Sequence, residues 1–70
     1  MSLSFCERLL ALRTDLGLTQ QQCANGVGIA KARYQHYETG RREPDIEMLI
    51  ALARFFGVSS DYLIGMSDQK

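Results

Sequence analysis

Residues 28–44, GIAKARYQHYETGRREP, interleave cationic side chains with two tyrosines in a pattern that could bind a polar partner. At about 100° per residue, Ala30, Tyr34 and Tyr37 fall on one side of a helix and form an apolar, aromatic face. The opposite face is small, polar and cationic. Its residues are Ala32, His36 and Thr39, flanked by Lys31 and Gln35 on one edge and by Arg33 on the other. The sequence therefore predicts a helix with one face for a core and one face for a partner.

Charge is unevenly distributed along the chain, although the formal net charge is zero. Between residues 31 and 42, Glu38 is the only acid beside Lys31, Arg33, Arg41 and Arg42. The neutral total and the pI of 6.5 argue weakly against a nucleic-acid partner. The distribution matters more than the sum, because a neutral total can hide a basic face.

Other kinds of chemistry find little support in the sequence. Asp45, Glu47 and Asp61 do not converge by sequence with a His or Ser into a catalytic set, and there is no nucleophile motif or phosphate-cradling glycine loop. His36 has no Cys or carboxylate at metal-ligand spacing. Tyr34 and Tyr37 could stack on single-stranded bases, but their inward position favours core packing, from which a hydroxyl could reach out to a phosphate. We expect no enzyme, no metal and no cofactor.

Length and composition predict one small, all-helical domain spanning residues 1–70. At 46% hydrophobic residues the chain can fold, its apolar residues recur at three and four, and no strand-like alternation is sustained. No apolar run approaches the ~18 residues of a membrane span, and no signal sequence opens the chain. Cys6 and Cys23 are too few and too dispersed for a disulfide framework or a zinc site. We therefore expect a cytoplasmic protein with free thiols.

Turn and capping signals divide the chain into five helices, of which the first two precede the stretch above. The first is expected to open with a Ser-x-x-Glu capping box at 4–7 and to end at Gly17. The second is expected to open with another capping box at 19–22 and to end near Gly26, with Gly28 taking a positive φ in the turn.

Three further helices follow from similar signals. The third closes at Gly40, and the fourth is capped by Asp45 after Pro44 and ends at Gly57. A short fifth helix starts at Ser59 or Ser60, and the last five residues are expected to fray. The apolar positions at core spacing are Phe5, Leu9, Leu12, Leu16, Cys23, Ala24, Val27, Ile46, Leu49, Ile50, Leu52, Ala53 and Phe56.

Two short helices joined by a tight glycine turn, at about 19–38, have the layout of a helix-turn-helix. The whole chain resembles the phage-repressor and Cro helix-turn-helix family, also called the xenobiotic-response-element class. The matching residues are Leu18-Thr19-Gln20, Ala24, Gly28-Ile29, Tyr34, Tyr37-Glu38, Gly40, Arg42, Pro44, Leu49, Leu52-Ala53, Gly57-Val58-Ser59 and Asp61-Tyr62-Leu63. The resemblance implies a compact five-helix, lambda-repressor-like domain of a transcriptional regulator that binds operator DNA as a homodimer.

The resemblance also implies roles for particular residues. Bases would be read by Lys31, Ala32 and His36, with Gln35 close by, and phosphates would be met by Thr19, Gln20, Arg33, Thr39, Arg41 and Arg42. Arg13 and Glu38 would form a buried ion pair, and the dimer contact is assigned to Tyr62, Ile64 and Met66. Side-chain chemistry agrees with the base-reading assignment, because a lysine can donate to guanine and an alanine can pack on a thymine methyl.

Position 30 departs from the family pattern. The family usually has Ser or Thr there, whose hydroxyl caps the third helix, whereas Ala30 cannot do so. A lost cap typically costs about 1 kcal/mol. Either Gly28 or water substitutes for the hydroxyl, or the helix start is shifted.

A helix-turn-helix used mainly for protein contacts, such as an antitoxin, is the alternative that the neutral net charge keeps open. That reading predicts weak DNA binding and an apolar surface for a protein partner, with Met48, Phe55, Tyr62 and Ile64 as candidates. A sequence-specific repressor instead predicts an inverted-repeat operator and, with three or four cations per subunit on phosphates, a salt slope of about −5 to −7. The polar, cationic face of the third helix suits DNA better than it suits a hydrophobic protein partner.

Overall fold

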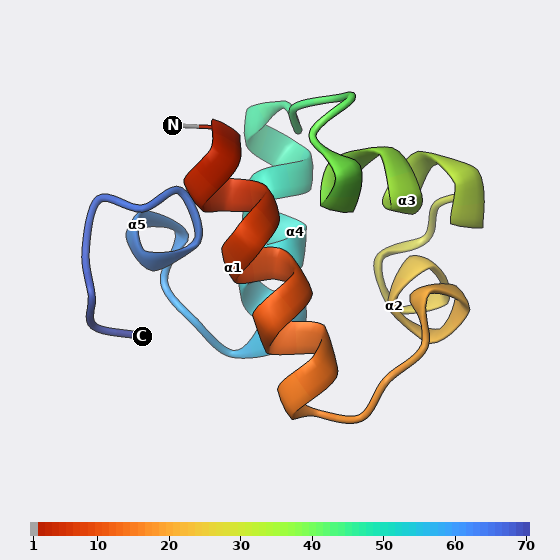
Figure 1. Ribbon diagram of the computed structural model, residues 1–70. Coiled ribbons are helices and arrows are strands. Elements are labelled where there is room, and N and C mark those ends of the chain that lie inside the picture. Colours follow the sequence, from red (N-terminus) through yellow and green to blue (C-terminus); the bar gives the residue numbers. More distant parts are fainter. Residues whose placement is uncertain (1) are drawn as a thin grey trace.

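The computed structural model describes the backbone of residues 2–70 and the side chains of residues 5–70. This part of the chain forms five helices and no strand: α1 Ser2–Asp15, α2 Gln20–Val27, α3 Lys31–Thr39, α4 Ile46–Phe56 and α5 Ser60–Leu63 (Figure 1). The all-helical, five-helix fold predicted from the sequence is confirmed. Among the described residues, no helix has the length and apolar character needed to cross a membrane.

The helices pack around α1, which crosses the front of the molecule in Figure 1. Helix α3 contacts α1 and α2, while α5 contacts α1 and α4. Helix α4 also packs on α2 and closes the domain behind α1. The helix-turn-helix of α2 and α3 therefore lies on one side of α1, and α5 lies on the other (Figure 1).

One apolar cluster joins all five helices. Its buried members are Phe5, Leu9, Leu12, Cys23, Ala24, Tyr34, Tyr37, Leu52, Ala53, Phe56 and Leu63. Tyr34 and Tyr37 are fully buried, and the Tyr37 ring meets Phe5 of α1 edge-on, with ring centroids 6.4 Å apart. The two tyrosines therefore belong to the core and offer no exposed surface for base stacking.

Three residues predicted for the core are exposed instead, so these predictions were wrong. The exposed fractions are 56% for Leu16, 75% for Ile46 and 41% for Ile50. Leu16 lies just beyond the end of α1, where the helical periodicity no longer applies. Ile46 and Ile50 are four residues apart and lie at one edge of the buried face of α4, to which Leu52, Ala53 and Phe56 belong.

The first helix begins earlier than the sequence predicts. Helix α1 starts at Ser2, so Ser4 is already helical and does not occupy the position of an N-cap. The side-chain contacts of the predicted capping box at Ser4 lie outside the described residues. A Ser-x-x-Glu spacing also fits the interior of a helix, which explains the error.

The second helix begins as predicted, with a complete capping box. Thr19 Oγ1 accepts from the Gln22 amide at 3.0 Å, and Gln22 Oε1 accepts from the Thr19 amide at 2.8 Å. The helix passes through Gly26 to Val27 and ends at Gly28, whose φ of 76° is left-handed as expected. The left-handed conformation of Gly28 thus determines the direction in which the chain continues into α3.

The C-terminal segment makes polar contacts with α1 and with the start of α5, while the fraying expected of the last five residues stays a prediction. Arg8 donates hydrogen bonds to the carbonyl oxygen of Ser67 at 2.6 Å and to Asp68 Oδ1 at 3.0 Å. The Ser59 amide donates to the carbonyl oxygen of Lys70 at 2.8 Å. These polar contacts hold a segment that has little apolar surface to bury.

Gly26 permits the close approach of α2 to α4. A Cβ built on Gly26 would overlap the Phe55 ring, lying 2.7 Å from Cδ1 and 2.9 Å from Cζ. We predict that Gly26→Ala lowers the free energy of unfolding by about 1 kcal/mol, because overpacking outweighs the better helix propensity of alanine. Denaturant unfolding measures this change. Asn25→Ala, at an exposed neighbouring position, should be close to neutral, and an equal loss there would contradict the packing explanation.

Candidate nucleic-acid interface

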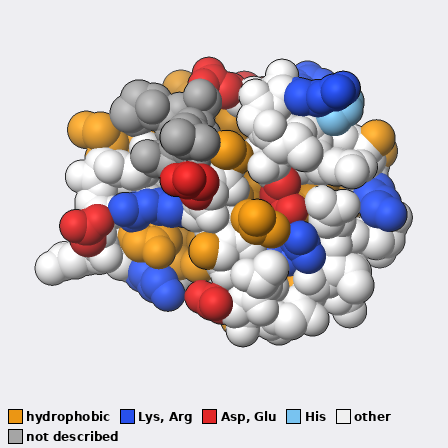
Figure 2. Space-filling view, in the orientation of Figure 1, with side chains coloured by type: hydrophobic (Ala, Val, Ile, Leu, Met, Phe, Trp, Pro, Cys, Tyr) orange, Lys and Arg blue, Asp and Glu red, His pale blue; other side chains and the backbone are white. Residues whose placement is uncertain are grey.

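The outer face of α3 carries the residues to which sequence reasoning assigned base contacts. Lys31, Ala32 and Gln35 are exposed and His36 is half-buried. Because the core tyrosines lie on the opposite side, packing and recognition use separate faces of one helix, as the periodicity predicts. Figure 2 shows basic side chains and a histidine gathered at the end of the molecule that α3 forms.

The start of α3 resolves the question raised by Ala30. The helix begins at Lys31, with Ala30 in extended conformation (φ −69°, ψ 149°) at the N-cap position. No side chain caps the helix there. The helix start is therefore not shifted, and the first-turn amides lack the side-chain acceptor that a serine or threonine would supply.

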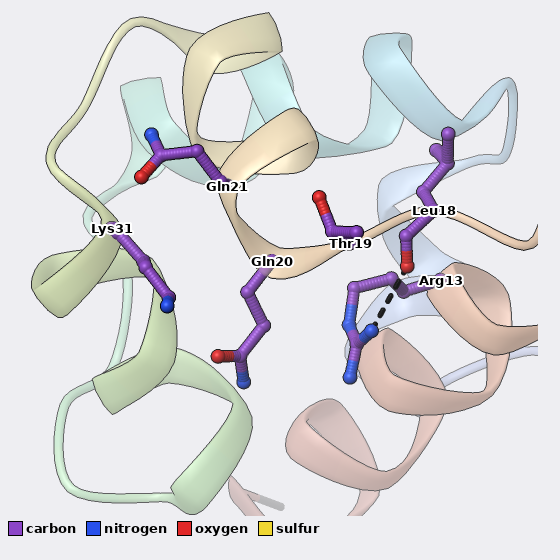
Figure 3. Close-up of a pocket in the computed structure, with 6 residues that line it drawn as sticks. All are labelled: Arg13, Leu18, Thr19, Gln20, Gln21 and Lys31. Atoms are coloured by element: carbon purple, nitrogen blue, oxygen red, sulfur yellow. Dashed lines mark hydrogen bonds between the residues drawn. The ribbon is translucent and has the colours of Figure 1, made fainter.

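A hollow lies between the start of α2 and the start of α3 (Figure 3). Its lining residues are Arg13, Leu18, Thr19, Gln20, Gln21 and Lys31. The Gln20 amide group and the Lys31 ammonium point into the same space from two helices. The Lys31 ammonium is a donor that suits an anion such as a phosphate, whereas Gln20 Nε2 already donates to Glu38 Oε1.

A second hollow lies on the far end of the α3 face and continues into the turn that follows. It is lined by Gln35, His36, Thr39 and Arg41. The amides of Arg41 and Arg42 both donate to the His36 carbonyl oxygen, at 3.0 Å and 3.2 Å. The two arginines are therefore held directly after α3, with exposed side chains.

The Arg13–Glu38 ion pair implied by the family resemblance is present and fastens three helices together. Arg13 Nε lies 2.6 Å from Glu38 Oε2, and their side chains are 17% and 4% exposed. Arg13 Nη1 also donates to the Leu18 carbonyl oxygen at 2.9 Å. Gln20 Nε2 donates to Glu38 Oε1 at 3.1 Å, so the pair also orients a side chain that lines the first hollow.

The surroundings of Glu38 shift its titration. Burial alone would raise the pKa of this carboxyl, but hydrogen bonds from Arg13 and Gln20 outweigh it, and the pKa is lowered. Burial first, and then the neighbouring Glu38 carboxylate, raise the pKa of the Tyr34 phenol far above its usual range. Glu38 is thus held ionised, and Tyr34 is held neutral.

Sequence reasoning missed some features of this surface. Leu18 and Gln21 line the first hollow although no role was assigned to them. Arg33 Nε donates to Tyr37 Oη at 2.9 Å, a contact that sequence reasoning did not predict. The spacing of four residues between Arg33 and Tyr37 is the signal that could have indicated this contact.

The residues assigned to the dimer contact lie away from α3, in α5 and the turn after it. The Tyr62 ring is half-buried, and the Arg8 guanidinium stacks on it at 4.3 Å. Ile64 is half-buried, whereas Met66 is 68% exposed. The structure thus places the assigned DNA contacts and the assigned dimer contacts on different surfaces.

Comparison with known families agrees with this geometry. A family model described as Helix-turn-helix matches residues 9–63. The chain belongs to this helix-turn-helix family. The resemblance to phage-repressor and Cro-type regulators is thereby confirmed.

Individual relatives extend the likeness over most of the chain. It is 42% identical over 64 residues to the HTH-type transcriptional regulator YobD of Bacillus subtilis, covering 91% of this chain and 57% of that protein. It is 36% identical over 64 residues to the cryptic phage CTXphi transcriptional repressor RstR of Vibrio cholerae, covering 91% and 58%. A crystal structure of a transcriptional regulator from Listeria innocua matches with a TM-score of 0.83 at 35% identity, covering 94% of this chain and 62% of that one. The chain thus spans less than two thirds of the length of each of these three proteins.

The missing cap on α3 leads to a stabilising substitution. We predict that Ala30→Ser raises the free energy of unfolding by about 1 kcal/mol, because the hydroxyl can accept from a first-turn amide. Denaturant unfolding followed by circular dichroism measures the change. Ala32→Ser, in the exposed first turn of the same helix, is the control and should be neutral or slightly destabilising. Equal gains for both variants would rule out capping as the cause.

The buried ion pair leads to a pH-dependent prediction. We expect Glu38→Gln to lower the free energy of unfolding at neutral pH by about 3 kcal/mol, because Arg13 then lacks its carboxylate. The folded-state pKa of Glu38 lies below the ordinary value of about 4.3. Its contribution is therefore complete above that value and is lost as the pH falls through the folded-state pKa.

Unfolding curves measured between neutral pH and strongly acidic pH test this dependence. Stability should fall less steeply toward acid in Glu38→Gln than in the wild type. Glu43→Gln, at an exposed carboxylate, should leave the pH dependence unchanged. Parallel curves for the wild type and Glu38→Gln would contradict the assignment.

Proposed function

We propose that this domain binds double-stranded operator DNA sequence-specifically, as a homodimer, and represses transcription in the cytoplasm by occupying the operator. The observation that carries the proposal is the separation of faces on α3, which buries two tyrosines and leaves a polar, cationic surface outward. In a helix-turn-helix, the second helix enters the major groove with this kind of face toward the base edges.

The outward side chains suit the chemistry of the groove. Lys31 would donate to guanine O6 or N7, and Ala32 would pack on a thymine methyl. Gln35 and His36 would donate to or accept from base edges one turn further along the helix. Each good base contact contributes about 1–3 kcal/mol of discrimination.

Phosphate contacts would surround this reading face. Thr19 and Gln20 border the first hollow, and Thr39 and Arg41 border the second. Arg42 follows in the same exposed turn, and Arg33 lies at the edge of α3. These contacts would position the helix without reading sequence and would dominate the salt dependence of binding.

A dimer would place two copies of α3 in successive major grooves, ~34 Å apart. In this proposal the α5 side supplies the subunit contact, with Tyr62, Ile64 and the exposed Met66. The operator would then be an inverted repeat, because the two-fold axis of the dimer is matched by the DNA. Occupancy of such a site blocks transcription where it overlaps a promoter.

Selection from a random duplex DNA library tests the proposal. We expect the purified wild-type protein to enrich an inverted repeat with half-sites about one helical turn apart. We expect Lys31→Ala to lose preference at particular base pairs within each half-site, because it removes a base contact. Sequencing of the bound pools measures both results.

Arg54→Ala, which removes an exposed cation from α4, is the matched control and should enrich the wild-type site. An unchanged preference in Lys31→Ala would remove the base-reading role of that residue. A folded wild-type protein that enriched no sequence would overturn the proposed function and would favour a protein partner instead.

A further inference from the structure

Arg33 and Tyr37 form a defined pair one turn apart on α3. Arg33 Nε donates to Tyr37 Oη at 2.9 Å, and the guanidinium carbon lies 5.8 Å from the centre of the Tyr37 ring. The hydroxyl therefore holds Arg33 through the nitrogen nearest the aliphatic stem. The two terminal nitrogens of the guanidinium, Nη1 and Nη2, take no part in this hydrogen bond.

The tyrosine is a rigid support for this contact. Its ring is fully buried and packs edge-on against Phe5, with an interplanar angle of 83°. A buried ring in a close-packed core has little freedom to move. The position of its hydroxyl is therefore set by the core, and Arg33 is ordered before any ligand binds.

The charge of Arg33 is not neutralised within the part of the chain that the structure describes. The ion pairs there join Arg8 to Asp68 and Arg13 to Glu38. The terminal nitrogens of Arg33 make no hydrogen bond to another described residue, and the side chain is half-buried at the domain surface. An ordered guanidinium with two free terminal donors fits a phosphate in bidentate geometry.

The location of Arg33 complements that of the first hollow. Lys31 and Gln20 face that hollow along one edge of α3. Arg33 lies two residues after Lys31, about 200° further around the helix, and so occupies the other edge. A helix in the major groove has one phosphate backbone on each side, and each edge can meet a different strand.

We propose that Tyr37 is a positioning residue for DNA binding. Its hydroxyl holds Arg33 so that the two terminal nitrogens clamp a phosphate of the strand opposite the one beside Lys31. The core thereby contributes to DNA affinity through a residue that does not touch DNA. This proposal rests on the proposed DNA-binding function and adds a role for a buried side chain.

A double-mutant cycle tests the pair. We expect Tyr37→Phe to weaken binding by about threefold per subunit, as for the loss of one hydrogen bond. Arg33→Ala should weaken binding more and should flatten the salt slope by about 0.9 per subunit. Tyr37→Phe added to Arg33→Ala should have no further effect. Titrations of the selected operator and of a scrambled duplex at several salt concentrations measure these changes. Each variant should lower the affinity for both duplexes by the same factor, because a phosphate carries no sequence information.

Controls separate positioning from folding. Tyr37→Phe keeps the ring in the core, and thermal unfolding without DNA establishes that the variant is folded. Arg33→Lys, at the surface, keeps the charge but lacks the Nε donor, so it should lower the affinity for DNA. When Tyr37→Phe is added to Arg33→Lys, the affinity should not change further.

The results that would contradict the positioning role differ from those that would contradict DNA binding. An equal effect of Tyr37→Phe in the Arg33→Ala background, or no effect in the wild type, overturns the positioning role while operator binding stands. A wild-type protein that binds neither duplex overturns the proposed function and this inference together.

Discussion

The buried carboxylate of Glu38 is the contact on which the arrangement of the helix-turn-helix depends. It is an acid on α3 that meets Arg13 of α1 and Gln20 of α2, so one side chain joins the three helices whose relative positions define the DNA-facing surface. A buried charge is costly unless it is paired, and the same carboxylate would be strongly unfavourable if α3 moved away from α1. The pair therefore specifies one position of α3 as well as contributing to stability.

The sequence predicted the fold well where local chemistry determines it. The capping box at Thr19 and the left-handed Gly28 mark the ends of α2, and both signals depend only on neighbouring residues. Periodicity separated the buried tyrosines of α3 from its outward face, because a nine-residue helix repeats the pattern more than twice. Helix boundaries, by contrast, were less accurate where a signal such as Ser4 fits more than one position.

The features that were missed depend on contacts distant in sequence. Ile46 and Ile50 have the spacing of core residues, but the packing of α4 on α2 and α5 decides which face is covered. Gly26 appeared to be a helix end, whereas the approach of Phe55 explains a glycine within the helix. For the candidate site, the types and positions of the outward residues followed from the sequence and the family resemblance. The first hollow did not, because it requires the placement of α1 and α2 beside α3. The Arg33–Tyr37 contact lies within α3, and its spacing of four residues is a local signal that was missed.

The route of the C-terminal segment has a practical consequence for attaching other proteins to this domain. Arg8 holds the segment along α1 and α5, so that α1 stands between Lys70 and α3 (Figure 1). A fluorescent protein or an affinity tag joined after Lys70 would emerge on the side opposite the proposed groove-binding face. The same attachment point lies beside the proposed subunit contact, since the Lys70 ammonium is 5.9 Å from the centre of the Tyr62 ring. A fused protein would therefore leave the groove-binding face open and would act first on the pairing of two subunits.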